Sequence, residues 1–204
     1  MQQIYRFPAP FVYSEDLPQH KEIKTFMMNE IEDDLELNGE DYVRTMGDEW
    51  HCDVISSYWR TAPLTFMNQE LYNTIVWQPL ARCINTLMQD SSMGAPQNPQ
   101  LEEFWYNRYA PGHFQEVHDH KVPGNRHTTY SGVYIVEMDE REENPTTFYY
   151  ENVPCHWHGG RALQYRTEDV KEGSVLLFPS DLMHYVKPTK HQRTSISFNI
   201  TTEV

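Results

Sequence analysis

The sequence has few cysteines, no long apolar run and no recognisable leader. Its three cysteines, Cys52, Cys83 and Cys155, are widely spaced and none belongs to a CxxC pair. This pattern excludes a disulfide framework and a cysteine-ligated zinc site, and it fits free thiols in a reducing compartment. No apolar run approaches the ~20 residues that span a bilayer, and the N-terminus lacks the basic and apolar regions of a signal peptide. We therefore expect a cytoplasmic protein.

Basic residues are also scarce relative to acidic ones. The 16 Lys and Arg against 30 Asp and Glu give a net charge of −14. A field of that sign repels phosphate backbones and anionic membranes, so neither nucleic acid nor a membrane is an expected partner. A small molecule or a peptide or protein side chain is the favoured substrate. The chain also lacks a GxSxG or papain-like pattern, so nothing indicates an activated nucleophile.

The sequence changes character near residue 100. Before it, Ile23, Phe26, Met27 and Ile31 recur at helical spacing, and residues 79–89 predict a second helix with Pro79 in its first turn. After it, short runs rich in β-branched and aromatic residues alternate with turn residues. These predicted strands are 104–110, 130–138, 146–150, 161–165, 174–178 and 193–201. We predict a helical segment over 1–100 packed on a β-core over 101–204, in one compact domain.

The last predicted strand has two distinct faces. Thr194, Ile196, Phe198 and Ile200 alternate with Arg193, Ser195, Ser197 and Asn199. In one interpretation the apolar face covers the core and the polar face meets water, which is the commoner case in antiparallel sheets. In the other, the apolar face packs on the helices and the polar face lines a ligand-binding interior.

The stretch HFQEVHDHK, residues 113–121, concentrates histidines. His118 and His120 are two residues apart, so on a strand they point the same way, and His184 follows 64 residues after His120. A first-row metal that must bind substrate needs few protein ligands, commonly two histidines and a carboxylate. The predicted ligands are His118, His120 and His184; a set in which Asp119 replaces one of them stays open.

Arg193 supports a site of this kind. An interior arginine needs an anion, and its planar fork binds carboxylates in bidentate fashion. Ser195 lies on the same strand face and could donate a second hydrogen bond. The alternative is a surface arginine paired with one of the many acids. A second His-x-His, His156 and His158, lies in a loop flanked by Pro and Gly, which we expect to face the cleft mouth or solvent.

Four segments in order resemble the iron(II)- and 2-oxoglutarate-dependent dioxygenases, and more closely the small oxygenases of bacteriophage and marine bacterial genomes. They are NRYAPGHFQEVHDH, SGVYIVEM, GSVLLFPSDLMHYVKP and RTSISFNI, within residues 104–200. The resemblance implies a double-stranded β-helix, or jelly-roll, with helices packed outside. It implies that His118 and His184 bind iron and that Arg193, assisted by Ser195, binds the distal carboxylate of 2-oxoglutarate. Asn107 and Tyr109 would hold the co-substrate.

One departure separates the chain from most of this superfamily. Most members have His-x-Asp, whereas this chain has His120 in the third position, as the similar small phage-type members do. The implied reaction consumes 2-oxoglutarate and O2, hydroxylates a substrate, and releases succinate and CO2. The predicted substrate contacts are loop residues near the metal: Arg126, His127, His156, Trp157 and His158. If phage-encoded, such an enzyme would act in the host cytoplasm.

Two other classes remain open at this stage. A cupin-like metal enzyme would use the three histidines without 2-oxoglutarate and would need no carboxylate anchor at Arg193. A non-catalytic β-barrel binding module would take up no metal.

Overall fold

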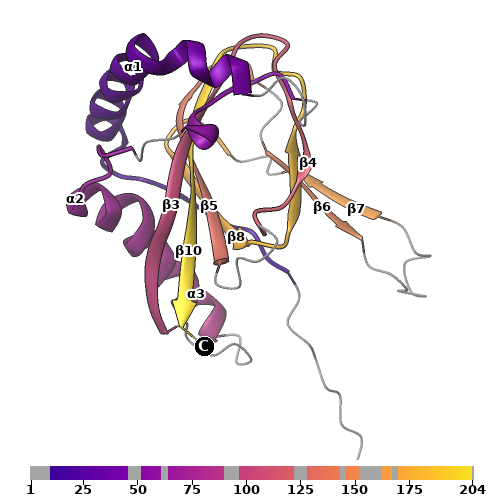
Figure 1. Ribbon diagram of the computed structural model, residues 1–204. Helices are drawn as coiled ribbons and strands as arrows, with labels where there is room; N and C mark the ends of the chain where they lie inside the picture. Colours follow the sequence, from indigo (N-terminus) through magenta and orange to yellow (C-terminus); the bar gives the residue numbers. More distant parts are fainter. Residues whose placement is uncertain are drawn as a thin grey trace, which may run out of the picture.

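The computed structural model describes residues 10–45, 52–60, 64–89, 97–121, 128–142, 146–151, 162–166 and 170–203. Within these residues two antiparallel β-sheets form the body of the protein (Figure 1). The larger sheet has the strand order β1 (Tyr13–Asp16), β8 (Ser174–Pro179), β5 (Thr128–Met138), β10 (Arg193–Glu203), β3 (Gln97–Tyr109) and β2 (Ile55–Ser56). The smaller sheet has the order β4 (Gln115–His118), β9 (Met183–Val186), β6 (Thr147–Glu151) and β7 (Ala162–Arg166).

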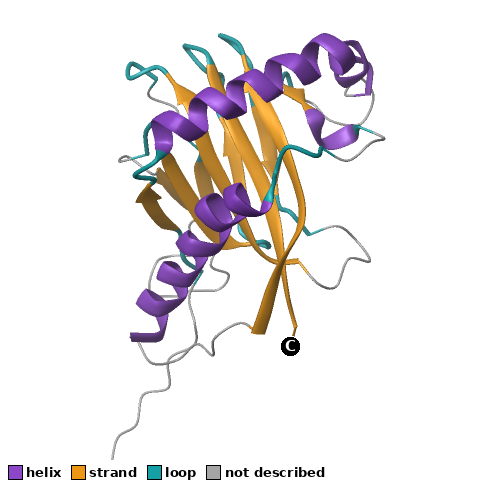
Figure 2. Ribbon diagram, turned by 90° about the vertical axis from the view of Figure 1, so that its left-hand side faces the viewer, coloured by secondary structure: helices purple, strands orange, loops and turns teal. Residues whose placement is uncertain are grey.

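The helices lie on one side of the larger sheet. Figure 2 shows α1 (His20–Thr45) and α3 (Gln78–Gln89) crossing the outer face of its strands. The shorter helical elements are a 3₁₀ turn, η1 (Ser57–Trp59), the single turn α2 (Gln69–Leu71) and a π-helical segment, η2 (Tyr72–Trp77). Of the described helices, none combines the length and the apolar character needed to cross a membrane.

The second predicted helix, residues 79–89, belongs to a helical stretch that begins earlier in the chain. Pro79 does lie in the first turn of α3, but the chain is already helical from Gln69 through the π-helical η2. A proline inside a helix lacks one N–H donor and its ring crowds the preceding turn. The π-helical segment directly before Pro79, where the Gln78 N–H donates to the Asn73 carbonyl, widens the helix at that point. The helix therefore continues through the proline.

The apolar face of β10 packs against the helices. Ile196, Phe198 and Ile200 are fully buried in one cluster with Met27 and Ile31 of α1. Each such side chain contributes roughly 1.5–3 kcal/mol by leaving water. The alternation in the last strand therefore serves to dock the larger sheet on α1.

The polar face of β10 is also buried. Arg193, Ser195 and Asn199 are each 1% exposed, and Ser197 is 4% exposed. On the same side of the larger sheet, Ile135 and Phe178 cluster with Phe148 of β6, so the space between the two sheets is filled with side chains. Of the two interpretations of this strand, the structure has the one in which the polar face lines the interior.

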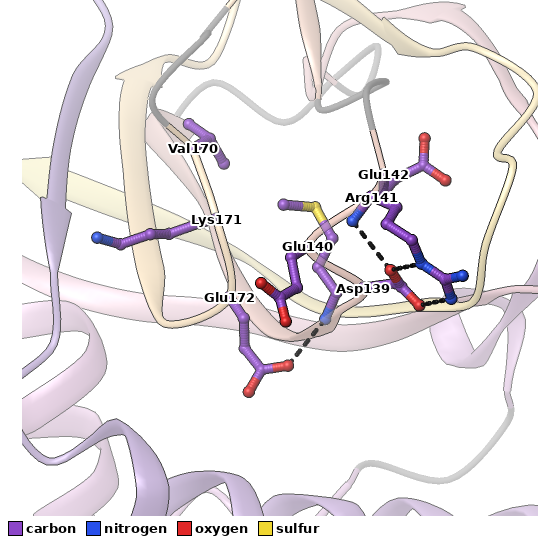
Figure 3. Close-up of a pocket in the computed structure, with 8 residues that line it drawn as sticks. Asp139, Glu140, Arg141, Glu142, Val170, Lys171 and Glu172 are labelled. Carbon is purple, nitrogen blue, oxygen red and sulfur yellow. Dashed lines mark hydrogen bonds and ion pairs between the residues drawn. The ribbon is translucent and has the colours of Figure 1, made fainter.

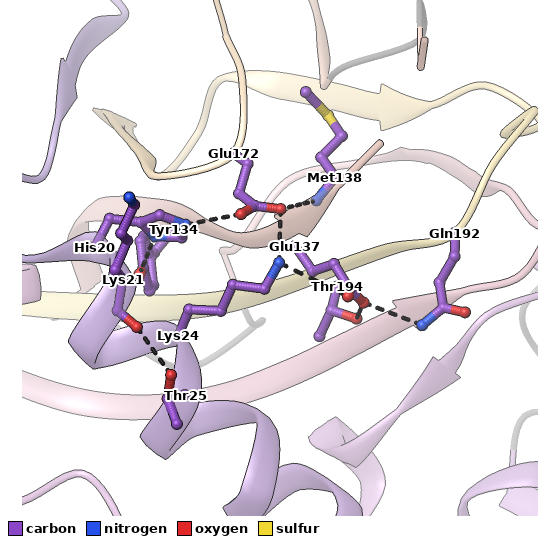
Figure 4. A network of polar contacts seen from close by, with 10 residues as sticks. All are labelled: His20, Lys21, Lys24, Thr25, Tyr134, Glu137, Met138, Glu172, Gln192 and Thr194. Atoms are coloured by element: carbon purple, nitrogen blue, oxygen red, sulfur yellow. Dashed lines mark hydrogen bonds and ion pairs between the residues drawn. The ribbon is translucent and has the colours of Figure 1, made fainter. Parts of the chain in front are cut away.

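A polar network fixes the start of α1 to the larger sheet (Figure 4). His20 Nδ1 lies 2.8 Å from the Tyr134 hydroxyl, and His20 Nε2 lies 3.1 Å from Glu172. Lys24 forms ion pairs with Glu172 at 2.8 Å and with Glu137 at 3.8 Å. Glu172, in the turn before β8, thus joins α1 to the end of β5, where it accepts the Met138 N–H at 3.1 Å.

The predicted fold class is confirmed: the protein is mainly β, with jelly-roll sheets and helices packed outside. The predicted strands of the second half all form. Two short strands of the first hundred residues, β1 and β2, were not predicted, and both pair with the larger sheet. Two residues carry too little hydrophobic alternation to predict a strand such as β2. The division into segments 1–100 and 101–204 stays a prediction.

Candidate metal and co-substrate site

Strand pairing in the smaller sheet brings the three histidines together. His118 at the end of β4 is the direct partner of His184 on β9. His120 follows two residues later, where its N–H donates to the Ser180 carbonyl at 2.9 Å. The ring centroids lie 4.3 Å apart for His118 and His184, 4.8 Å for His120 and His184, and 5.5 Å for His118 and His120. One ring nitrogen of each lies within 4.8 Å of the others, which suits a single ion.

Hydrogen bonds orient all three imidazoles the same way. The Nδ1 of His118 lies 2.7 Å from the Glu116 carbonyl, and that of His184 lies 3.0 Å from the Leu182 carbonyl. Because carbonyl oxygens only accept, each Nδ1 carries the proton. His120 Nδ1 likewise lies 3.0 Å from Asn199 Oδ1. Nε2 then carries the lone pair in each ring, which is the arrangement of metal-ligating histidines.

The surroundings keep these rings neutral. Burial lowers the pKa of His118, it lowers the pKa of His184 well below its ordinary value, and it brings the pKa of His120 down to about 3. The mutual repulsion of the charged forms lowers the pKa of His120 and His184 further. A histidine must be neutral to bind a metal, so these three neutral imidazoles, two of them buried and one half-buried, are ready ligands.

Asp119 lies apart from this cluster. Its Oδ1 accepts a hydrogen bond from the backbone N–H of Lys121 at 3.0 Å, so the carboxylate closes a local turn of the chain. In the described part of the chain, the group of potential ligands close enough for one ion contains His120 and not Asp119. This geometry favours the ligand set with three histidines.

Arg193 is the first residue of β10; it lies in the space between the sheets and is 1% exposed. Its Nη2 donates to Thr146 Oγ1 at 2.9 Å, and its guanidinium carbon lies 5.3 Å from the centre of the Tyr109 ring. Its Nε and Nη1 have no hydrogen-bond partner within the described residues. Burial lowers the pKa of Arg193, whereas Tyr109 and Glu142 raise it. A buried cation with unpaired donors calls for an anionic ligand.

Two further buried polar atoms lack partners beside Arg193. On β3, Tyr109 lies opposite Arg193 and Asn107 lies opposite Ser195. Ser195 Oγ and Asn107 Oδ1 have no hydrogen-bond partner among the described residues. The Asn107 amide nitrogen donates to Ser197 Oγ at 3.2 Å, and the Tyr109 hydroxyl donates to Gln115 Oε1 at 2.8 Å. The unpaired donors of Arg193 and Ser195 fit a carboxylate, so this part of the interior fits a dianion such as 2-oxoglutarate.

The predicted substrate contacts, Arg126, His127, His156, Trp157 and His158, lie outside the described residues. The structure adds neighbours of the site that sequence reasoning missed. Thr146 holds Arg193, Trp105 packs its ring 5.2 Å from that of His120, and Asn199 bonds His120. Of these three, only Asn199 could have been found from the sequence, because it is the fourth residue of the polar face of β10.

A hollow of about 1080 Å³ lies over the turns between β5 and β6 and before β8 (Figure 3). Four acidic residues line it, and three of them have structural partners. Asp139 pairs with Arg141 at 2.6 Å, and Glu172 accepts the Met138 N–H at 3.1 Å. Glu142 accepts the N–H groups of Lys190 and His191 at 2.7 and 2.8 Å. None of the three clustered histidines lines this hollow.

Comparisons with known proteins agree with this geometry. A family described as "Putative 2OG-Fe(II) oxygenase" matches residues 103–199, just under half of the chain. No curated protein matches the sequence significantly. A solved prolyl-4-hydroxylase from Pseudomonas putida is similar over 95% of this chain and 93% of its own, at 12% identity and a TM-score of 0.56.

Two more solved structures share the fold. The carbocyclase SnoK of nogalamycin biosynthesis, described as non-heme and alpha-ketoglutarate dependent, is similar over 93% of this chain and 79% of its own, at 12% identity and a TM-score of 0.57. A prolyl hydroxylase from Trichoplax adhaerens, solved with a hypoxia inducible factor peptide, is similar over 93% and 83%, at 13% identity and a TM-score of 0.53. At these identities the likeness concerns the fold alone.

The family match covers β3 to β10 and therefore all the residues that build the site. The family implies iron(II), 2-oxoglutarate and O2, and the three clustered histidines provide the metal-binding group that it requires. Residues 103–199, which hold the site, therefore resemble the iron(II)- and 2-oxoglutarate-dependent oxygenases, and the whole chain shares the fold of the solved structures above.

Proposed function

We propose that this enzyme hydroxylates a peptide or protein side chain or a small molecule, using His118, His120 and His184 to bind iron(II) and Arg193 to bind 2-oxoglutarate. Bound iron(II) supplies the oxidising chemistry: one oxygen atom of O2 enters the substrate, the other enters succinate, and 2-oxoglutarate loses CO2. The observation that carries this proposal is the buried Arg193, whose Nε and Nη1 are without partners in the described interior that also holds the histidines.

The histidines hold the metal through their Nε2 atoms in this proposal. Their Nδ1 atoms are fixed by two backbone carbonyls and one side-chain amide, so ring rotation is restricted before any ion arrives. Such preorganisation favours binding because little ordering remains to be done. Three protein ligands leave open positions for the co-substrate and O2.

Arg193 and Ser195 bind the far carboxylate of 2-oxoglutarate. Thr146 and the face of the Tyr109 ring fix the guanidinium, so its unpaired N–H groups stay directed into the interior. Asn107 lies opposite Ser195, where its unpaired Oδ1 is available to a bound water or to the co-substrate. Binding would pair donors that are now buried without partners, which stabilises the complex beyond the charge attraction itself.

The aromatic side chains around the histidines exclude water. The ring of Phe178 lies 4.9 Å from that of His184, and Phe148 lies 5.8 Å from the same ring. Trp105 covers His120. A dry surrounding strengthens each electrostatic contact in the site and protects a reactive oxidant from side reactions.

The net charge of −14 favours a neutral or basic substrate over nucleic acid. Among such substrates we favour a peptide or protein side chain. The similar folds do not choose between the classes, since they include prolyl hydroxylases and a carbocyclase. The Arg193 anchor sets the proposal apart from a cupin-like enzyme, which would need no such cation.

Anaerobic titration tests the proposal. The apoprotein should bind one iron(II), and 2-oxoglutarate added afterwards should produce a weak visible charge-transfer band. His184→Ala should remove both signals, whereas Arg193→Leu should keep the metal and lose the band at the same 2-oxoglutarate concentration. A wild-type protein that binds no metal would refute the proposal and favour a binding module instead.

The substrate can then be sought directly. Succinate release should increase when the loaded enzyme is incubated with a cell extract, and mass spectrometry should find a product heavier by one oxygen atom. Arg193→Leu enzyme provides the matched control, because any product it forms in equal amount does not depend on 2-oxoglutarate binding.

A further inference from the structure

The site has one less negative charge than a site with two histidines and a carboxylate. Three neutral imidazoles around a divalent ion leave a net charge of +2, whereas a carboxylate ligand would leave +1. A more positive site holds its metal less tightly and favours the reduced ion. A carboxylate placed just outside the ligands would offset this difference.

A hydrogen-bonded chain leads from His120 to such a carboxylate. His120 Nδ1 donates to Asn199 Oδ1 at 3.0 Å, and Asn199 Nδ2 donates to Glu103 Oε1 at 2.6 Å. Asn199 and Glu103 are direct partners across the pairing of β10 and β3, so the sheet itself sets their positions. Asn199 is 1% exposed, and Glu103 is half-buried behind it.

The amide of Asn199 can take only one orientation in this chain. Ser131 Oγ also donates to Asn199 Oδ1, at 2.7 Å, so two donors converge on the oxygen. The nitrogen therefore faces Glu103, whose carboxylate accepts. A short bond to an ionised acceptor polarises the amide, and the polarised oxygen draws the His120 proton more strongly.

We propose that Glu103, acting through Asn199, is a positioning residue that supplies to His120 the negative charge that the three-histidine site lacks. This inference rests on the proposed function, because it takes the three histidines as the metal ligands. Carboxylate–histidine–metal chains are common in metalloproteins, where they orient the ring and raise its basicity. Here an amide stands between carboxylate and imidazole.

Glu102 provides a matched control for Glu103. It is the preceding residue of β3, it is exposed, and its carboxylate accepts from Thr128 Oγ1 rather than from Asn199. Glu102→Gln and Glu103→Gln remove the same charge from adjacent positions. Any effect of net charge alone should therefore appear equally in both variants.

The experiment measures anaerobic binding of Co(II) to the apoprotein by calorimetry, with no co-substrate and no turnover. Glu103→Gln should weaken Co(II) binding by about 10- to 100-fold, the range typical for loss of such a partner, whereas Glu102→Gln should bind as the wild type does. The visible spectrum of bound Co(II) should shift in Glu103→Gln only. With iron, the reduction potential of Glu103→Gln should lie above that of the wild type.

A double variant separates this role from a merely structural one. Asn199→Asp combined with Glu103→Gln exchanges the amide and the carboxylate, so the carboxylate now accepts directly from His120. This protein should recover wild-type Co(II) affinity or exceed it. Equal Co(II) affinity of Glu103→Gln and wild type, or equal losses in Glu102→Gln and Glu103→Gln, would overturn the inference. Failure of the wild type itself to bind Co(II) would instead overturn the proposed function.

Discussion

Replacement of Arg193 by methionine should make the apoprotein more stable and the enzyme inactive. Arg193→Met removes a buried cation whose Nε and Nη1 have no partner in the described interior. Replacement of buried ionic groups by apolar ones of similar size is often stabilising, by about 1–4 kcal/mol. The loss of the bond to Thr146 Oγ1, at 2.9 Å, offsets about 1 kcal/mol of this gain.

We therefore expect a net stabilisation of about 2 kcal/mol. For a chain of this size each kcal/mol raises Tm by about 2–4 °C, so the Tm of the apoprotein should rise by about 4–8 °C. The 2-oxoglutarate complex should respond in the opposite direction. Truncation of one partner of a buried charge pair typically costs 2–5 kcal/mol, and about 3 kcal/mol corresponds to about 140-fold weaker binding.

Anaerobic thermal melts with Mn(II) bound measure both effects. At a 2-oxoglutarate concentration 100 times its Kd, the wild type should gain about 2.7 kcal/mol, and the variant should gain only about 0.3 kcal/mol at the same concentration. Arg193→Lys keeps the charge without the planar fork and should lie between the two. An Arg193→Met protein that melts below the wild type and still gains stability from 2-oxoglutarate would show that the guanidinium is structural.

Four more predictions follow from the same structure. His184→Ala should abolish stable metal binding in calorimetry, since it removes one of the three proposed ligands. His120→Ala should lose the metal whereas Asp119→Ala should keep it, and the reverse result would contradict the ligand set; His120→Asp should retain iron. The free energy of unfolding of the apoprotein should fall as pH drops below about 6.5, by up to about 1.4 kcal/mol per pH unit for each buried imidazole. The reason is that these imidazoles become protonated in the unfolded chain but stay neutral in the folded one, where their pKa is lowered. Urea titrations at pH 7 and 5 measure this loss, and His120→Gln should reduce it. Gly132→Ala should lower the free energy of unfolding by about 1–3 kcal/mol, because its added carbon would lie 2.2 Å from the Phe198 ring.

Much of the fold could be predicted from the repeating patterns of the sequence. Alternation in the strand 193–201 separates its two faces without reference to the rest of the protein, since side chains on a strand alternate. Ile23, Met27 and Ile31 likewise mark the buried side of α1, whereas Phe26, predicted on the same face, is 38% exposed. Local periodicity therefore specified most of the longer elements and which of their side chains share a face, but not the short strands β1 and β2.

The sequence also marked His118, His120, His184 and Arg193 by residue type and spacing. It could not show that these side chains meet, since the pairing of β4 with β9 joins segments 64 residues apart. Spacing left Asp119 open as a ligand, and only its hydrogen bond to the Lys121 N–H shows which way it turns.

Tertiary structure alone decided the two matters on which function depends most. Whether the polar face of β10 meets water or the interior is set by what covers the other face, and α1 covers it. The chain from His120 through Asn199 to Glu103 depends on the register of β10 against β3, where a slip of one residue would turn Glu103 to the opposite face. Strand register is a property of two segments together, so neither segment's sequence contains it.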